Sequence, residues 1–120
     1  MLRCCALILL TGVSLFAQDL LELSRTYASK RDFDLAISTA QQYLKTDPAS
    51  VPGRLALANA YFMAQRLTEA RELALQILRT EPGQATALKI KGNAEYLLGD
   101  VSTAITTFID LLDRHPDDEE

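Results

Sequence analysis

The sequence contains few of the residue types from which catalytic and metal sites are built. Its 120 residues include two adjacent cysteines, Cys4 and Cys5, and one histidine, His115. The five glycines are scattered and form no phosphate-binding loop, and no His/Cys cluster has metal-ligand spacing. We therefore expect no catalytic residue, no metal and no cofactor, and we interpret His115 as a helix C-terminal residue favoured by the helix dipole.

Strand patterns and excess positive charge are also lacking. Valine is scarce, and no alternating apolar run exceeds a few residues, so the pattern disfavours strands. The chain has 12 basic and 16 acidic residues and a net charge of −4. A mildly acidic surface does not attract nucleic acid or anionic lipid in general, so nucleic acid is not an expected partner. The acidic run 117–120 is typical of a solvated end.

The first 17 residues have the order of a secretory signal peptide. Arg3 precedes an apolar run over residues 4–10, and Ala17 supplies a small residue at a cleavage position. The alternative is an uncut membrane anchor, but the run is interrupted at Gly12 and falls short of the roughly 20 residues of a spanning helix. We predict cleavage between Ala17 and Gln18, which would remove both cysteines and leave no integral membrane segment. The short signal and the lack of disulfides indicate a protein exported to the bacterial periplasm or secreted.

A 34-residue period runs through the remainder of the sequence. Pro48, Pro82 and Pro116 are spaced 34 residues apart, and two columns of small residues keep the same spacing. These columns are Ala36, Ala70 and Ala104, and Ser24, Ala58 and Gly92. Such a period indicates stacked helix pairs, because one pair cannot bury its apolar face alone. We divide the chain into repeats 17–50, 51–84 and 85–118, followed by an acidic tail, 119–120.

Each predicted repeat contains two helices joined by a turn. In the first repeat, the positions i, i+3, i+4 and i+7 hold Leu20, Leu23, Ser24 and Tyr27, the spacing of one helix face. We predict that Asp32, Thr68 and Asp100 cap the second helix of each pair. Gly99, directly before Asp100, is the expected turn residue of the third pair.

This pattern resembles the tetratricopeptide repeat, over the whole chain that follows the signal. The third repeat carries Gly92-Asn93-Ala94, Tyr96, Gly99-Asp100, Ala104-Ile105, Phe108 and Pro116. The second carries Ala58-Asn59-Ala60-Tyr61, Ala70 and Pro82, and the first carries Tyr27, Asp32-Phe33, Ala36-Ile37 and Asp47-Pro48. The resemblance implies an all-α, right-handed superhelical array of three helix-turn-helix repeats. It also implies a module that binds a protein or peptide and is not an enzyme.

The resemblance further implies a binding groove on the concave side, lined by the first helices of the repeats. By register, the groove residues are Arg25, Leu55, Asn59, Phe62, Met63, Lys89, Asn93 and Tyr96, with Leu21 and Leu97 beside them. Aromatic and thioether side chains would give apolar contact, the amides would pair with a peptide backbone, and the cations would meet a carboxylate. Phe62 and Tyr96 have an alternative interpretation as core residues.

One activity of the family is not expected here. Some members hold the carboxylate of a chaperone tail in a clamp of Lys, Asn and Arg side chains. The matching places hold Leu21, Arg25, Ala56, Thr86 and Ile90. Because only Arg25 is basic, a chaperone-tail adaptor is disfavoured.

The last predicted helix carries an unusual second stripe. Ile105, Ile109 and Leu112 are all apolar, whereas the equivalent stripes are Ile37, Gln41, Leu44 and Arg71, Leu75, Leu78. We expect this stripe to be an interface with a second copy or with a partner. The sequence thus predicts an exported interaction module; the alternatives are a self-associating scaffold or an accessory subunit of an envelope assembly or secretion machine.

Overall fold

The computed structural model describes residues 18–117, so the predicted signal peptide and the last three residues lie outside the description. Residues 18–29 are helical, and no strand occurs between residues 18 and 117. Five helices follow: α2 (Phe33–Thr46), α3 (Val51–Met63), α4 (Leu67–Thr80), α5 (Ala85–Leu97) and α6 (Val101–Arg114). The predicted all-α class is therefore confirmed.

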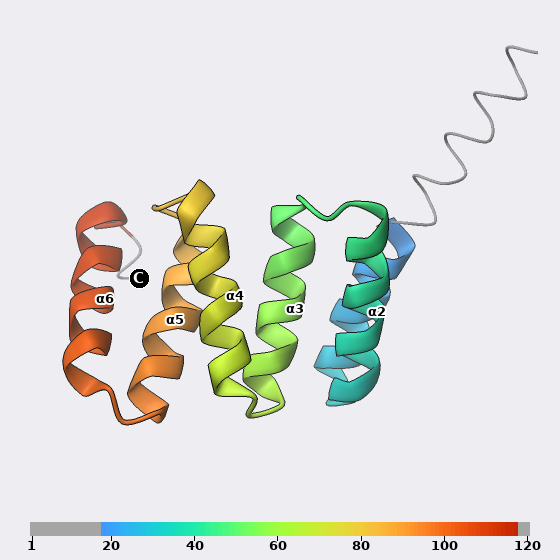
Figure 1. Cartoon of the computed structure of the whole chain (residues 1–120), viewed down its shortest axis with the longest axis horizontal. Coiled ribbons are helices and arrows are strands. Elements are labelled where there is room, and N and C mark those ends of the chain that lie inside the picture. The colour runs from blue at the N-terminus through green and yellow to red at the C-terminus, as the bar shows by residue number, and fades with distance from the viewer. Residues whose placement is uncertain (1–17, 118–120) are drawn as a thin grey trace, which may run out of the picture.

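The helices form three antiparallel hairpins that stand side by side along one axis (Figure 1). Residues 18–29 pair with α2, α3 pairs with α4, and α5 pairs with α6. Each helix from α2 onward packs on its successor, and α3 also packs on α5. Among the described helices, α4 and α6 make no such contact. The layer that holds α3 and α5 is thus the more closely spaced one, and it forms the inner, concave side of a superhelical array.

The three hairpin turns share one backbone motif. Arg31, Gln65 and Gly99 all have positive φ, at 66°, 64° and 92°. In the second hairpin, the N–H of Gln65 donates to the Phe62 carbonyl at 3.0 Å, and the next N–H reaches back to Tyr61 at 2.9 Å. This pair of bonds is the Schellman motif at the end of a helix. The position with left-handed backbone conformation in this motif favours glycine. The predicted turn at Gly99 is confirmed.

The predicted helix caps agree with the structure only in part. Asp32 and Asp100 occupy the N-cap positions of α2 and α6, but neither side chain bonds a backbone N–H. The prediction for Thr68 is wrong. Helix α4 begins at Leu67, so Thr68 lies within its first helical turn. The reason is that the hairpin turn has a fixed length, which places Arg66 at the N-cap.

Side chains cap the inner helices, which the sequence reasoning missed. The N–H of Gly53 donates to Ser50 Oγ at 3.1 Å at the start of α3. The N–H of Ala87 donates to Gln84 Oε1 at 2.8 Å at the start of α5. Both caps satisfy a donor that the helix leaves without a partner.

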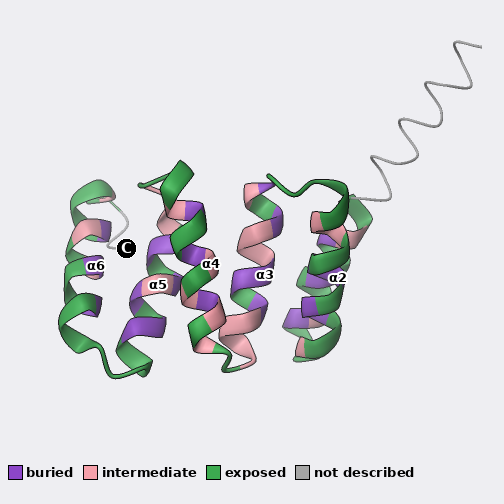
Figure 2. Ribbon diagram, viewed as in Figure 1, coloured by how far each residue is buried: buried purple, intermediate pink, exposed green. Residues whose placement is uncertain are grey.

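The small residues of the 34-residue columns lie where two helices touch. Ala36, Ala58 and Ala70 have no exposed surface, and Ser24 Oγ donates to the Ala36 carbonyl at 2.8 Å. At Gly92, an added Cβ would lie 2.7 Å from the ring of Phe108. Figure 2 shows the buried residues on the facing sides of neighbouring helices. Close backbone approach is therefore the reason for the columns.

Candidate functional site

A groove of about 480 Å³ crosses the inner layer of helices. Three helical segments line it: Arg25 from residues 18–29, Thr86 from α5, and Pro52, Leu55, Ala56 and Asn59 from α3. The structure thus brings together three of the predicted groove residues, Arg25, Leu55 and Asn59. Their convergence follows from the 34-residue period, which places equivalent residues of successive hairpins beside one another.

The polar groups of this groove have only weak partners within the chain. Arg25 Nη1 donates to Glu22 Oε1 at 2.8 Å, with the two side chains 52% and 70% exposed. Such a surface ion pair contributes little free energy, so the guanidinium can exchange this partner for a ligand. Asn59 Nδ2 lies 3.5 Å from Met63 Sδ, and because a thioether is a weak acceptor, the amide also remains available.

The apolar residues predicted for the groove on α3 are half-buried. Leu55 and Phe62 pack against the cluster formed by α3, α4 and α5, and Met63 packs against the cluster formed by the first hairpin and α3. Leu21 is buried. Phe62 therefore takes part in core packing, as the alternative interpretation allowed, and its substitution would disturb the fold as well as the groove.

The predicted residues on α5 are exposed and lie outside the lining of this groove. Lys89 and Asn93 are exposed, and Tyr96 is 59% exposed. The core interpretation of Tyr96 is therefore wrong. The residue 34 positions after Tyr61, and 68 after Tyr27, is Glu95, which is only 1% exposed. The register that placed Tyr96 with Tyr27 and Tyr61 was therefore wrong by one residue.

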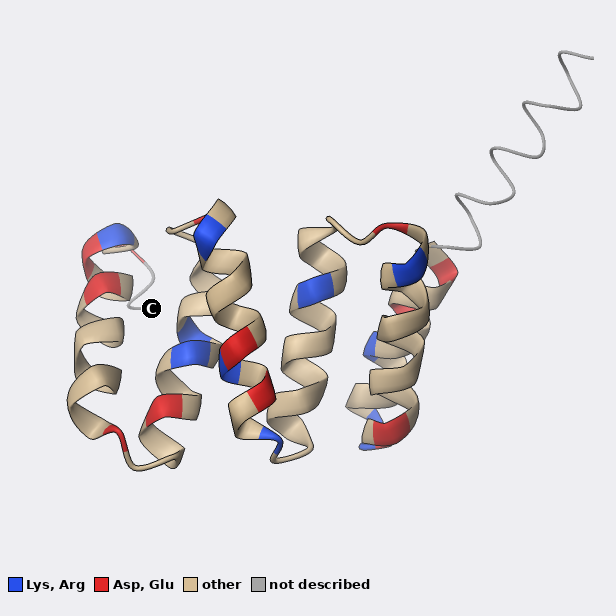
Figure 3. Ribbon diagram, in the orientation of Figure 1, with Lys and Arg blue, Asp and Glu red and all other residues tan. Residues whose placement is uncertain are grey.

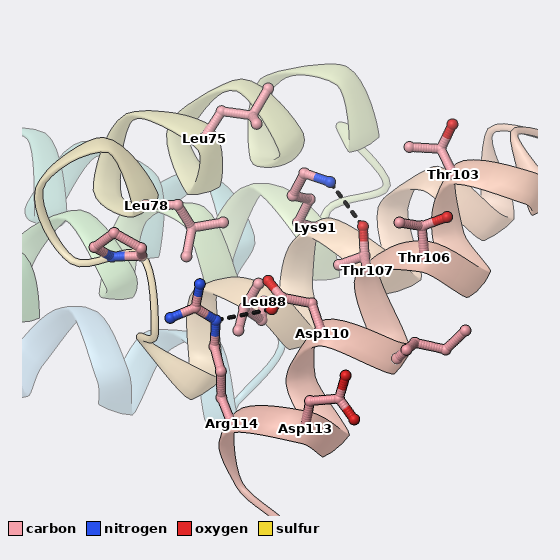
Figure 4. A pocket seen from close by; sticks show the side chains of 12 residues that line it. Leu75, Leu78, Leu88, Lys91, Thr103, Thr106, Thr107, Asp110, Asp113 and Arg114 are labelled. Atoms are coloured by element: carbon pink, nitrogen blue, oxygen red, sulfur yellow. Dashed lines mark hydrogen bonds and ion pairs between the residues drawn. The ribbon is translucent and has the colours of Figure 1, made fainter.

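Glu95 belongs to a buried polar network that the sequence reasoning missed. Lys91 Nζ donates to Glu95 Oε1 at 2.8 Å and to Thr107 Oγ1 at 2.7 Å, and this hydroxyl donates to Glu95 Oε1 at 2.8 Å. Figure 4 shows Lys91 and Thr107 facing each other beneath a second groove of about 560 Å³, between α4 and α6. The sequence does hold one indication of this network: Glu95 stands at the repeat position that is tyrosine in the two earlier hairpins.

His115 is the C-cap residue of α6, in line with its interpretation as a helix C-terminal residue. Its Nε2 lies 2.7 Å from the carbonyl oxygen of Gly83, in the loop between α4 and α5. The ring thus ties the end of α6 to the preceding hairpin, a structural contact rather than part of a catalytic group.

Exposed apolar side chains gather at the C-terminal end of the array. Ten large apolar side chains are exposed among the described residues, and seven of them lie between residues 96 and 112. They are Tyr96, Leu97, Leu98, Val101, Ile105, Ile109 and Leu112, which include the whole predicted stripe. We call Val101, Ile105, Ile109 and Leu112 with Tyr96 and Leu98 the C-terminal face. Figure 2 shows most of α6 exposed, with its buried residues on the side toward α5.

Three interior counterparts of this face are covered by a following helix. Ile37 is buried, and Leu44 is half-buried and packs with α3. Leu78 packs in the cluster that contains Ala87 and Ile90 of α5. At Ile37, Leu44 and Leu78 the following inner helix covers the stripe, whereas Gln41 and Leu75, the counterparts of Ile109, are exposed. In the described residues no helix covers the stripe on α6.

Comparisons with known proteins agree with this architecture. Family models described as tetratricopeptide repeat match residues 27–94 and 90–118. The chain therefore belongs to the tetratricopeptide repeat family. The search of curated proteins finds no match.

Two solved structures are similar in fold. The first is the first repeat domain of Spaghetti (RPAP3) bound to the HSP90 peptide SRMEEVD, with a TM-score of 0.80 at 20% identity, covering 86% of this chain and 82% of that one. The second is the first such domain of human RPAP3, with a TM-score of 0.79 at 20% identity, covering 86% of this chain and 81% of that one. At this identity, the likeness establishes the fold alone.

The described part of the chain has neither a metal-binding cluster nor a membrane-spanning helix. Residues 18–117 contain no group of three or more His, Cys, Asp or Glu side chains placed to hold a metal ion. Within the same range, no helix has the length and hydropathy to cross a membrane. The described residues thus present the concave groove, the groove between α4 and α6, and the C-terminal face as candidate surfaces.

Proposed function

We propose that the chain is a protein-interaction module that binds a peptide segment of a partner protein in its concave groove. The observation that carries this proposal is the groove of about 480 Å³, in which Arg25, Asn59 and Thr86 come from three different hairpins. Family membership supports it, because tetratricopeptide domains mediate protein–protein interaction. The similar domain of Spaghetti is described as bound to a peptide.

The groove favours an extended segment with at least one carboxylate. Asn59, with Asn93 exposed on the next inner helix, offers amides that can pair with a peptide backbone. Arg25 at one end and Lys89 toward the other can meet acidic groups. The HSP90 peptide is not the expected ligand, since Ala56 lies where a chaperone-tail clamp needs an amide, and Thr86 lies where it needs a cation.

The test is a binding titration with groove variants. A partner would first be identified by crosslinking in the native cell envelope, and its binding segment would be synthesised as a peptide. Each amide contributes about 1 kcal/mol, so Asn59→Ala with Asn93→Ala should weaken binding roughly 30-fold. Gln76→Ala, which removes an exposed amide on α4, is the matched control and should bind normally.

Phe62→Ala is a weaker probe of the groove, because Phe62 also packs against the core. It should weaken binding and lower the melting temperature together. If the double asparagine variant and Arg25→Ala both bind the peptide as tightly as the unchanged protein, the concave groove is not the binding site.

A second interaction surface is proposed at the C-terminal face, because seven of the ten exposed large apolar side chains of the described residues cluster between residues 96 and 112. An apolar surface of this kind typically marks an interaction site. Through this face the chain would act as a self-associating scaffold, or as an accessory subunit of an envelope assembly or secretion machine.

We propose further that the protein works outside the cytoplasm, in a bacterial periplasm or secreted. The basis is the order of the first residues: Arg3, the apolar run and Ala17. N-terminal sequencing of the protein from its own host should therefore start at or near Gln18. An intact Met1 in the soluble cytoplasmic fraction would overturn this proposal.

A further inference from the structure

Four apolar residues along one edge of α6 follow a spacing that is the same read in either direction, and exposed Ile109 lies beside this set. Val101, Ile105, Phe108 and Leu112 are separated by four, three and four residues, which is the spacing of a coiled-coil seam. Val101, Ile105 and Leu112 are exposed, and Phe108 is half-buried against Gly92. We call these four residues the α6 seam.

We propose that the α6 seam pairs with the α6 seam of a second copy, with the two helices antiparallel about a two-fold axis. This inference names the occupant of the C-terminal face and rests on the second surface proposed above. An axis that passes between Thr106 and Thr107 sets Val101 against Leu112 of the partner subunit. The same axis sets Ile105 against Phe108 of the partner subunit. A symmetric spacing is what an isologous interface requires, because one patch must match itself.

The other end of the array excludes a head-to-tail stack. Inner helix α3 presents Gly53 and Ala60 to the first hairpin, where Gly53 faces Tyr43 and Ala60 packs with Ile37. One period earlier, the equivalent positions hold Asp19 and Thr26, both exposed. A second copy stacked on the C-terminal face would therefore bury the Asp19 carboxylate against Leu112, and the Thr26 hydroxyl against Ile105. A buried carboxylate is unfavourable without a partner charge.

The C-terminal face also differs from the face of the first hairpin that receives α3, although the second hairpin has apolar Leu75 at the same position. In the first hairpin, Gln41 Nε2 donates to the hydroxyl of Tyr61 on α3 at 3.2 Å. The contact between this hairpin and α3 therefore includes a polar interaction. The equivalent of Gln41 is Ile109, which cannot make such a bond. A partner that mimics α3 would lose this contact, whereas an identical apolar seam has no need of it.

The charges permit the two-fold pairing. The sequence from Val101 to Ile109 has no charged residue, and Figure 3 shows α6 uncharged over this stretch, with acidic residues near its ends. Across the axis, Ser102 lies beside Ile109 of the partner subunit at the rim. No like charges therefore meet within the seam, and no charge is buried there.

The area indicates a weak dimer. The six apolar side chains of the C-terminal face, each about half exposed, would supply roughly 300 Å² of apolar surface per copy. Since apolar atoms make up a little over half of a typical interface, the total is about 1,000 Å² for both copies, at the low end of specific interfaces. We therefore expect association at micromolar concentration.

The first test is the mass of the protein in solution, obtained after expression of the full chain. Sedimentation equilibrium between about 1 and 100 µM, where a small interface has its Kd, should show a shift from one chain to two. Ile105→Glu should remain a single chain over this range. Leu35→Glu changes an exposed leucine outside the face, and it should dimerise normally. At a concentration where all three proteins are single chains, far-UV circular dichroism should show equal melting temperatures, because association would otherwise raise the melting temperature of the dimers.

The second test addresses the geometry. The two-fold axis places the two side chains at position 105 about one helical turn apart. Mixing Ile105→Glu with Ile105→Lys should therefore restore a dimer that contains one chain of each. A wild-type dimer that the mixture fails to restore would overturn the antiparallel pairing.

A wild-type protein that stays a single chain at all concentrations would overturn the inference as a whole. If Ile105→Glu also lost a different captured protein, the C-terminal face would remain a binding surface with another occupant. The groove proposal is judged separately, because Ile105→Glu should bind the groove peptide with unchanged affinity.

Discussion

The buried network in the third hairpin makes a sharp prediction about stability. Lys91 and Glu95 form an ion pair with their side chains 19% and 2% exposed. Lys91→Leu would leave the carboxylate buried with only the Thr107 hydroxyl as a partner. Removing one member of a buried pair typically costs about 3–5 kcal/mol. Because Lys91 lines the open groove between α4 and α6, water can reach the site, and we expect about 2–3 kcal/mol.

The second hairpin supplies the matched control. Its residues at the equivalent positions are Leu57, Tyr61 and Leu73, which pack in the apolar clusters. The triple variant Lys91→Leu, Glu95→Tyr, Thr107→Leu copies this set into the third hairpin. Replacing a whole buried polar group by apolar residues of similar shape is often neutral or stabilising, so the triple variant should be at least as stable as the unchanged protein.

The assay is thermal and urea denaturation followed by far-UV circular dichroism. For a chain of this size, the single variant should melt roughly 10–20 °C lower. A loss below about 1 kcal/mol in Lys91→Leu, the range of surface pairs, would show that Glu95 does not depend on Lys91. A triple variant less stable than the single variant would show that the third hairpin cannot accept the packing of the second.

Two further substitutions test the backbone contacts. Gly92→Ala should destabilise the protein by about 1–3 kcal/mol, because the added Cβ would lie 2.7 Å from Phe108; unchanged urea denaturation would refute the close contact. Gln65→Gly should stabilise it by up to about 1 kcal/mol, since Gln65 holds φ at 64° and a left-handed conformation disfavours a side chain; a lower melting temperature would contradict this reasoning.

Much of the architecture could be predicted because it depends on periodic features. Pro48, Pro82 and Pro116 set the length of the unit, and the small-residue columns mark where helices touch. These signals are local or repeated, so they survive without knowledge of the tertiary contacts. The same period brought Arg25, Leu55 and Asn59 to one groove, as the register implied.

The sequence by itself thus determined the helical class, the pairing of helices and the apolar character of the last stripe. The tertiary structure decided which way each side chain points around its helix axis and how deeply it is buried. A shift of one residue on a helix turns a side chain by about 100°, which separates buried Glu95 from exposed Tyr96. The left-handed Arg31 and Gln65 follow from the shared hairpin-turn geometry rather than from residue type. The caps at Ser50 and Gln84 depend on where the loops between the hairpins place these side chains. Which polar residues are buried together, as in the Lys91 network, is decided only when two helices pack.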